Sequence, residues 1–292
     1  YSCRGIFWRP SFEITDDESM QKTFPIDIDF APIRTERCAD YIISAMFNPK
    51  LHNFQMMAWM CSLKGQIPIF TTHPTSAPRE VHGPDDKRQE YWAGTCTTPR
   101  CYLKDGVLAA LYKAQSPNAK VQGADFTHAY FPTEDFDEWF QSDRWFFARL
   151  GSAYVGLFAP EGATLTQTGK WARKEITAPG ANALWVCICG SKSKDGNFDN
   201  FQRRCLSTTI KYDKTASTAD VLAGKTQFAL SFADGPVEDG KAVRFDNWAH
   251  MDNAIVHVDS GSPIMKIQTS RGEKTLDFSK ARVLLEKWQR RD

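Results

Sequence analysis

The sequence predicts a mainly β protein: a large antiparallel β-sandwich with a few short helices and a C-terminal amphipathic helix. Two observations predict it. Apolar and polar residues alternate with a period of two along most of the chain, and the alternating segments are separated by short turns rich in Gly, Asp and Pro. Short strands at such regular spacing are typical of a sandwich. We expect one domain over residues 1–292, with room for a subdivision near 206–292.

The predicted strands follow one another along the chain. Up to residue 213 they cover 39–47, 53–63, 66–73, 106–114, 144–150, 152–159, 183–190 and 206–213. In the last quarter they are the segments TQFALSFA, AIVHVD, IMKIQTS and KTLDFS. Each is bounded by turn-forming residues, which is the pattern expected of hairpins.

Helices are expected at only three places. Thr133 is placed to cap a helix over EDFDEWF, whose apolar residues would share one face. A second short helix is predicted at 199–205. The segment SKARVLLEKWQRR, 279–291, has helical apolar spacing and arginines at its end, where they suit the helix dipole.

Composition argues against two classes of partner. The net charge of +1, without a long run of one sign, is unlike the basic surface of a nucleic-acid-binding protein. No stretch reaches the roughly 18 apolar residues of a membrane span. The first residues lack a signal-peptide pattern, so we expect a leader already removed or a piece of something longer.

Eight cysteines leave two interpretations open. One is a secreted or extracytoplasmic protein with one to three disulfides, among them a tight loop closed by Cys96 and Cys101; the other is a reduced intracellular protein with buried thiols. Cys187 and Cys189 point the same way from one predicted strand and are not placed to bond to each other. Because the chain has no CxxC pair, we expect no metal site and no cofactor. The cysteines that could link distant segments by disulfides are Cys3, Cys38, Cys61 and Cys205.

Polar-tipped aromatic and basic residues gather at predicted strand ends and loops. No phosphate cradle, HExxH or GxSxG motif accompanies them. An acidic polysaccharide would use all of them, because arginines pair with uronate carboxylates, aromatic rings stack on sugars, and His or Tyr can move protons in β-elimination. The catalytic candidates are His73, His128 and Tyr130, and the substrate-binding candidates are Arg79, Tyr91, Trp92 and Arg100.

Each of these residues also has an ordinary structural interpretation. A histidine before a proline at a strand end, such as His73, is more often a structural hydrogen-bonding group than a base. Tyr130 could tuck its ring under the helix predicted at 133–140, and Trp92 could seal a sheet edge. The aromatic run at 136–147 has the spacing that burial requires.

The segments FTTHP, YWAGTCTTPR, FTHAYFPTEDFDEW, WFFARLGSAYVGLFAPEG and LWVCICG, spread over residues 38–205, resemble the C-terminal β-sandwich of heparinase II/III-like polysaccharide lyases. In that family an α/α toroid precedes a stack of antiparallel sheets. The toroid supplies a catalytic Tyr and commonly an Asn, and the sandwich supplies a His, for which His73 and His128 are the matching positions. This chain contains no such toroid.

The resemblance implies the β-sandwich part of a lyase that cleaves uronic-acid-containing glycans by β-elimination. Its partners would be an acidic polysaccharide or oligosaccharide and a helical domain or chain. The alternative is a non-catalytic, lectin-like carbohydrate-binding protein, which needs the aromatic rim but no base. A third hypothesis is an interaction domain that meets another protein through the loop 74–92.

Overall fold

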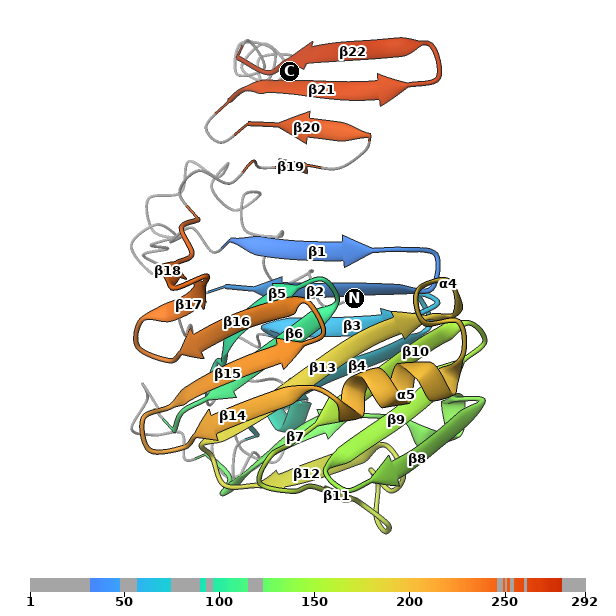
Figure 1. Ribbon diagram of the computed structural model, residues 1–292, viewed down its shortest axis with the longest axis vertical. Helices are drawn as coiled ribbons and strands as arrows, with labels where there is room; N and C mark the ends of the chain where they lie inside the picture. Colours follow the sequence, from blue (N-terminus) through green and yellow to red (C-terminus); the bar gives the residue numbers. More distant parts are fainter. Residues whose placement is uncertain are drawn as a thin grey trace, which may run out of the picture. The chain divides into compact units, whose positions relative to one another are not determined.

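The mainly β prediction is confirmed by a computed structural model of the protein, which is built almost entirely from antiparallel sheets (Figure 1). It describes residues 32–47, 57–74, 90–92, 97–114, 123–245, 249, 251–252, 255–259 and 262–279. The chain divides into two compact units, residues 1–242 and 243–292. The strands between 206 and 242 therefore belong to the first unit. Within the described residues no helix is long and apolar enough to span a bilayer.

The first unit contains a seven-stranded sheet in the order β1-β2-β3-β4-β7-β12-β11. Neighbouring strands in it are antiparallel, and β4 and β7 pair although the chain between them passes through a different sheet. Its strands are β1 (Ile33–Arg37), β2 (Tyr41–Met46), β3 (Trp59–Leu63), β4 (Ile67–Thr72), β7 (Phe126–Tyr130), β11 (Thr164–Leu165) and β12 (Glu175–Pro179).

A six-stranded sheet, in the order β5-β6-β13-β10-β9-β8, packs against the first. Its strands are β5 (Arg100–Lys104), β6 (Val107–Tyr112), β8 (Glu138–Ser142), β9 (Trp145–Leu150), β10 (Ala153–Phe158) and β13 (Ala183–Ser191). A five-stranded sheet consists of β14 (Thr209–Asp213), β15 (Thr218–Ala223), β16 (Thr226–Ser231), β17 (Gly235–Glu238) and β18 (Lys241–Ala242). The short helices among its described residues are η1 (Glu90–Trp92), η2 (Thr133–Asp135), α4 (Lys192–Asp195) and α5 (Phe198–Leu206).

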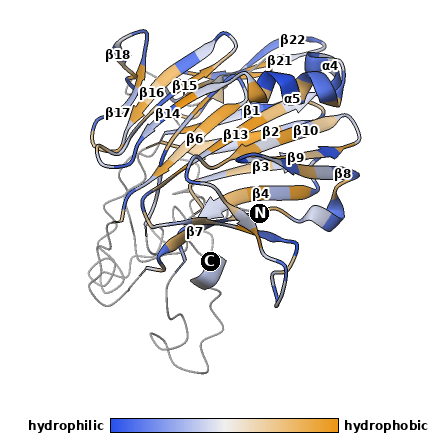
Figure 2. Cartoon of the chain, turned by 60° about the horizontal axis from the view of Figure 1, so that its bottom comes forward, coloured by the Kyte–Doolittle hydropathy of each residue, from blue (hydrophilic) through white to orange (hydrophobic). Residues whose placement is uncertain are grey.

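The six-stranded sheet is covered on both faces, which explains its composition. Every residue of β6, β10 and β13 is buried, and their sequences are apolar without alternation. Figure 2 shows this as hydrophobic colouring along β6 and β13, in contrast to the hydrophilic α4. One face meets the seven-stranded sheet, and α5 and the five-stranded sheet cover the other. Gly190 is required there, because a Cβ on it would lie 2.2 Å from the ring of Phe201 in α5.

Polar pairs connect the two larger sheets through the core. The indole N–H of Trp185 in β13 donates to the Thr127 hydroxyl in β7 at 2.9 Å. The hydroxyls of Tyr112 in β6 and Thr71 in β4 lie 2.9 Å apart. Buried polar groups of this kind need partners, and these side chains satisfy one another.

The second unit, described by itself, contains a four-stranded antiparallel sheet in the order β19-β20-β21-β22. Its strands are β19 (Met251–Asp252), β20 (Val256–Val258), β21 (Ile264–Thr269) and β22 (Gly272–Asp277). The strand predictions for this part of the chain are confirmed. The predicted C-terminal helix, 279–291, falls almost wholly outside the described residues.

One local prediction is wrong. The helix expected over 134–140 is one short turn, η2, followed by strand β8, which pairs with β9 through a tight turn at 143–144. Thr133 does not cap it; its hydroxyl donates to the Arg173 carbonyl at 2.8 Å. Cys101 is a buried free thiol, as are four of the five other described cysteines, and Cys96 lies outside the described residues.

Candidate functional site

The candidate site lies on the outer face of the seven-stranded sheet, where β4, β7 and β12 run side by side. His128 in β7 stands opposite Thr72 in β4 and Thr177 in β12, and Tyr130 stands opposite Phe70 and Glu175. The period of two in β7 turns His128 and Tyr130 to the outer face, while Thr127 faces the core. We call this set the outer-face cluster; its members are Phe70, Thr72, Tyr91, Trp92, His128, Tyr130, Trp171 and Glu175.

Both ring nitrogens of His128 have protein partners. Its Nδ1 lies 2.7 Å from Oε1 of Glu175, and its Nε2 lies 2.6 Å from the hydroxyl of Thr72. The hydroxyl of Tyr91 donates to the same Glu175 oxygen at 2.6 Å, and Thr166 donates to Oε2 at 3.1 Å. Glu175 is thus the centre of a hydrogen-bonded network that joins η1, β7 and the β11–β12 connection.

The aromatic residues of η1 cover this network. The indole of Trp92 stacks flat on the His128 imidazole, with ring centroids 3.8 Å apart and planes 3° apart, and the Tyr91 ring meets it edge-on at 4.8 Å. The side chain of His128 is 0% exposed and that of Glu175 is 4% exposed. The network is therefore enclosed by protein.

The environment sets the charges of this buried pair. Burial lowers the pKa of His128 and outweighs the hydrogen bond to Glu175, which acts in the opposite direction. Burial also acts to raise the pKa of Glu175, but the hydrogen bonds from His128 and Tyr91 outweigh it, so the pKa lies below its usual value. The arrangement is a neutral imidazole that donates from Nδ1 to an ionised carboxylate and accepts from Thr72 at Nε2.

The outer rim of the cluster is aromatic and half-exposed. The rings of Tyr91 and Trp171 are nearly parallel, 11° apart, with centroids separated by 6.4 Å, and Tyr130 stacks on Phe70 at 5.5 Å. Tyr91, Tyr130 and Trp171 each keep part of their surface in solvent, whereas Phe70 is buried. We call the exposed surfaces of these three rings the rim of the outer-face cluster; it is the part of the cluster that a ligand can contact.

Basic residues flank Trp171 in the β11–β12 connection. The ammonium of Lys170 lies 5.0 Å from the Trp171 ring centroid. Arg173 is exposed and lies 3.4 Å from the Glu134 carboxylate, and Lys174 is partly exposed. The exposed rim therefore combines aromatic faces with positive charge.

The second histidine candidate, His73, is also enclosed. It follows β4 and is 2% exposed; its Nδ1 lies 2.8 Å from the Thr97 hydroxyl and its Nε2 lies 2.8 Å from the Ala124 carbonyl. Burial lowers the pKa of this imidazole, so it is neutral. With both nitrogens bound by protein, His73 holds loop segments together.

The other predicted site residues do not all lie in one place. Tyr91, Trp92, His128 and Tyr130 come together in the outer-face cluster. Arg100 does not contact them; its Nε donates to the Phe232 carbonyl at 2.9 Å, and its guanidinium lies over the Phe232 ring. Arg79 lies outside the described residues.

Sequence reasoning missed Glu175, Thr72 and Trp171. Nothing local distinguishes Glu175, because an acidic residue at a strand start looks like a solvent-facing side chain. Trp171 carried a usable signal, since it stands between basic residues in GKWARK, where a loop was expected.

The fold and cluster define a β-sandwich protein with a half-exposed aromatic and basic rim on one sheet face. Comparison with family models, with curated proteins and with solved structures finds no match to this chain.

Proposed function

We propose that the protein is a carbohydrate-binding β-sandwich that takes an acidic glycan on the rim of the outer-face cluster. The observation that carries the proposal is the pair of partly exposed, nearly parallel rings of Tyr91 and Trp171 with Lys170 beside them. Aromatic faces pack on the apolar faces of sugar rings, and a neighbouring ammonium or guanidinium attracts uronate or sulfate groups.

The buried part of the outer-face cluster supports this role by fixing the position of the Tyr91 ring. The Tyr91 hydroxyl donates a hydrogen bond to Glu175 at 2.6 Å, and Trp92, the next residue in η1, stacks on His128. Such contacts restrict the Tyr91 ring before a ligand arrives, and a pre-organised ring loses less conformational entropy on binding.

The test measures binding of oligouronates, heparin-like oligosaccharides and neutral glucans to the full chain by calorimetry and tryptophan fluorescence. We expect an acidic glycan to bind, Trp171→Ala to weaken that binding by about tenfold, or about 1.4 kcal/mol, and added salt to weaken it further. The matched control is Trp139→Ala, which removes a half-exposed tryptophan from β8. The proposal fails if no glycan binds, or if both tryptophan variants behave alike.

A β-elimination activity is a second proposal, favoured by one feature of the same network. Burial and the hydrogen bond to Glu175 raise the pKa of Tyr91, so the hydroxyl of this half-exposed residue stays protonated and could protonate a leaving sugar oxygen. A base for the C5 proton has less support, because His73 and His128 are enclosed with both nitrogens occupied.

The ultraviolet absorbance of an unsaturated uronate product distinguishes the two proposals. Product formation by the full-length gene product, lost in Tyr91→Phe while glycan binding persists, would support elimination. Binding without product on a broad uronate panel would leave the carbohydrate-binding proposal alone.

A further inference from the structure

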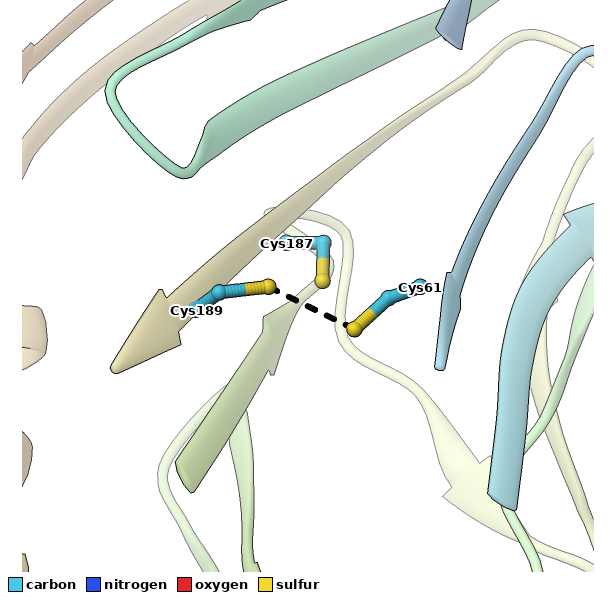
Figure 3. Close-up of side chains that lie close together, drawn as sticks. All are labelled: Cys61, Cys187 and Cys189. Atoms are coloured by element: carbon cyan, nitrogen blue, oxygen red, sulfur yellow. Dashed lines mark hydrogen bonds between the residues drawn. The ribbon is translucent and has the colours of Figure 1, made fainter. Parts of the chain in front are cut away.

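We propose that Cys61, Cys187 and Cys189 form a binding site for one thiophilic metal ion, copper(I), between the two large sheets. Figure 3 shows the three side chains converging, Cys61 from β3 and the other two from β13. Their sulfur atoms all lie within 4.8 Å of one another, and those of Cys61 and Cys189 are 3.4 Å apart. Sequence spacing did not indicate this site, because Cys187 and Cys189 are separated by a single residue and Cys61 comes from a different sheet.

The geometry suits a three-sulfur site. A metal–sulfur bond of about 2.3 Å places the sulfurs of a trigonal site about 4 Å apart, within the spread seen here. Cys187 and Cys189 are two residues apart on one strand, so the pleat aims both at the opposite sheet. A disulfide would need a sulfur separation of about 2.05 Å, much shorter than the observed contact.

The set of donors selects the metal. Thiolates are soft ligands that favour copper(I), zinc and iron–sulfur clusters. Among the described residues this group comprises only the three cysteines, with no fourth His, Cys, Asp or Glu. Structural zinc almost always takes four ligands, whereas copper(I) is stable with three sulfurs. The geometry therefore points to copper(I) ahead of zinc.

The surroundings are dry and apolar. All three cysteines are 0% exposed. The residues directly opposite them on neighbouring strands share their face of each sheet, and they are Ile43, Ile69, Leu108, Val155 and Leu157. Such a shell keeps water from a bound copper(I) ion, and it requires that the metal enter as the chain folds.

Bound metal would tie β3 to β13 and so connect the two sheets. Without metal, a hydrogen bond to a neighbouring thiol and burial raise the pKa of Cys61 and Cys187, and burial raises that of Cys189. The unoccupied state is then three neutral thiols that pack like small apolar side chains. Metal uptake must displace protons from them.

The test refolds the full chain anaerobically, under reducing conditions, with copper(I), with zinc or with no metal. After a weak competing chelator removes loose metal, mass spectrometry gives the metal content. We expect one copper per chain, less zinc than copper, and a higher midpoint of thermal unfolding with copper. X-ray absorption should show sulfur neighbours only.

Variants assign the site. Cys61→Ala and, separately, Cys187→Ala should abolish retention of copper, while Cys101→Ala, a buried free thiol outside the cluster, should retain it. Circular dichroism checks that each variant refolds; if the alanine variants do not, Cys189→Ser and the X-ray absorption of the wild-type chain decide. Absence of retained copper, equal retention in the Cys61 and Cys101 variants, nitrogen or oxygen neighbours, a preference for zinc, or a Cys61–Cys189 disulfide in the native protein would each overturn the assignment.

Discussion

The imidazole of His128 lies flat against the indole of Trp92, with ring centroids 3.8 Å apart and an angle of 3° between the planes. This stack closes the outer face of the seven-stranded sheet over the hydrogen bond between His128 and Glu175. It also explains why Trp92 and His128, both candidate site residues in the sequence, are buried. The indole of Trp92 covers the imidazole of His128.

Removing the Trp92 indole should loosen the packing of the outer-face cluster. We expect Trp92→Ala to lower the free energy of unfolding by about 3–5 kcal/mol, the range for truncating a buried tryptophan. Water would then reach His128, so its pKa should rise toward the ordinary value of about 6.5, as NMR titration would measure. Trp92→Phe is the control and should cost less, because it keeps a flat ring and removes an indole N–H that has no partner among the described residues. A His128 pKa unchanged in Trp92→Ala would show that Trp92 is not what excludes water.

The two buried histidines should make the protein acid-sensitive. Burial lowers the pKa of both His73 and His128, so the unfolded chain takes up protons near pH 6.5 that the folded chain does not. Their contribution to stability is present above that pH and is lost as the pH falls, by up to about 1.4 kcal/mol per pH unit for each histidine.

Urea unfolding at neutral pH and about one unit below pH 6.5 measures this dependence. His73→Gln should reduce the difference between the two conditions. His257→Gln is the matched control, because His257 is a partly exposed histidine of the second unit, 2.9 Å from Asp259. Equal stability of the wild-type protein at both pH values would contradict the prediction.

Close packing of α5 on β13 makes Gly190 sensitive to a single added carbon. A Cβ there would lie 2.2 Å from the Phe201 ring and 2.6 Å from the Asp195 carboxylate. We expect Gly190→Ala to destabilise the first unit by roughly 1–3 kcal/mol or more, because a packed ring cannot retreat without repacking its neighbours. Gly156→Ala is the control in β10, where the nearest atom is the Cys205 sulfur at 3.1 Å. Thermal unfolding of the two variants should rank Gly190→Ala as the less stable, and the reverse order would contradict the packing described.

Much of the fold could be predicted because strand patterns are local. Segments such as 144–150 and 183–190 contain apolar, β-branched and aromatic residues between clear turns, and they form β9 and β13. The error at 134–140 arose because Trp139 and Phe140 follow Phe136 by three and four residues, the spacing of one helix face. Pairing of β8 with β9 overrides that spacing, because the hairpin supplies backbone hydrogen bonds that a short helix could not match.

The candidate site was less predictable, because its geometry depends on contacts between distant segments. His128 meets Thr72 across 56 residues and Glu175 across 47, and sequence spacing gives no measure of either contact. The residue types of Tyr91 and Trp92 suggested a surface for a ligand, but which rings remain exposed depends on how η1 and the β11–β12 connection pack on the face formed by β4, β7 and β12.

A buried carboxylate, that of Asp40, holds three turns together at one end of the sandwich. Asp40, 7% exposed, accepts hydrogen bonds from the Lys64 ammonium and from the Ser152 hydroxyl. These residues belong to the β1–β2, β3–β4 and β9–β10 turns, so the contact joins both large sheets. We expect Asp40→Ala to lower the free energy of unfolding by about 1–3 kcal/mol, because it leaves the partly buried ammonium without its carboxylate.

The comparison is with a more exposed ion pair in the same unit, Arg149 and Glu138, whose atoms lie 3.1 Å apart across β8 and β9. Glu138→Ala should cost less than about 1 kcal/mol, since solvent screens such a pair and the side chains lose entropy in forming it. Urea unfolding in low and high salt separates the two variants further, because salt should diminish the Glu138 effect and leave most of the Asp40 effect. Equal losses in the two variants would mean that Asp40 behaves as an ordinary surface charge and does not hold the turns together.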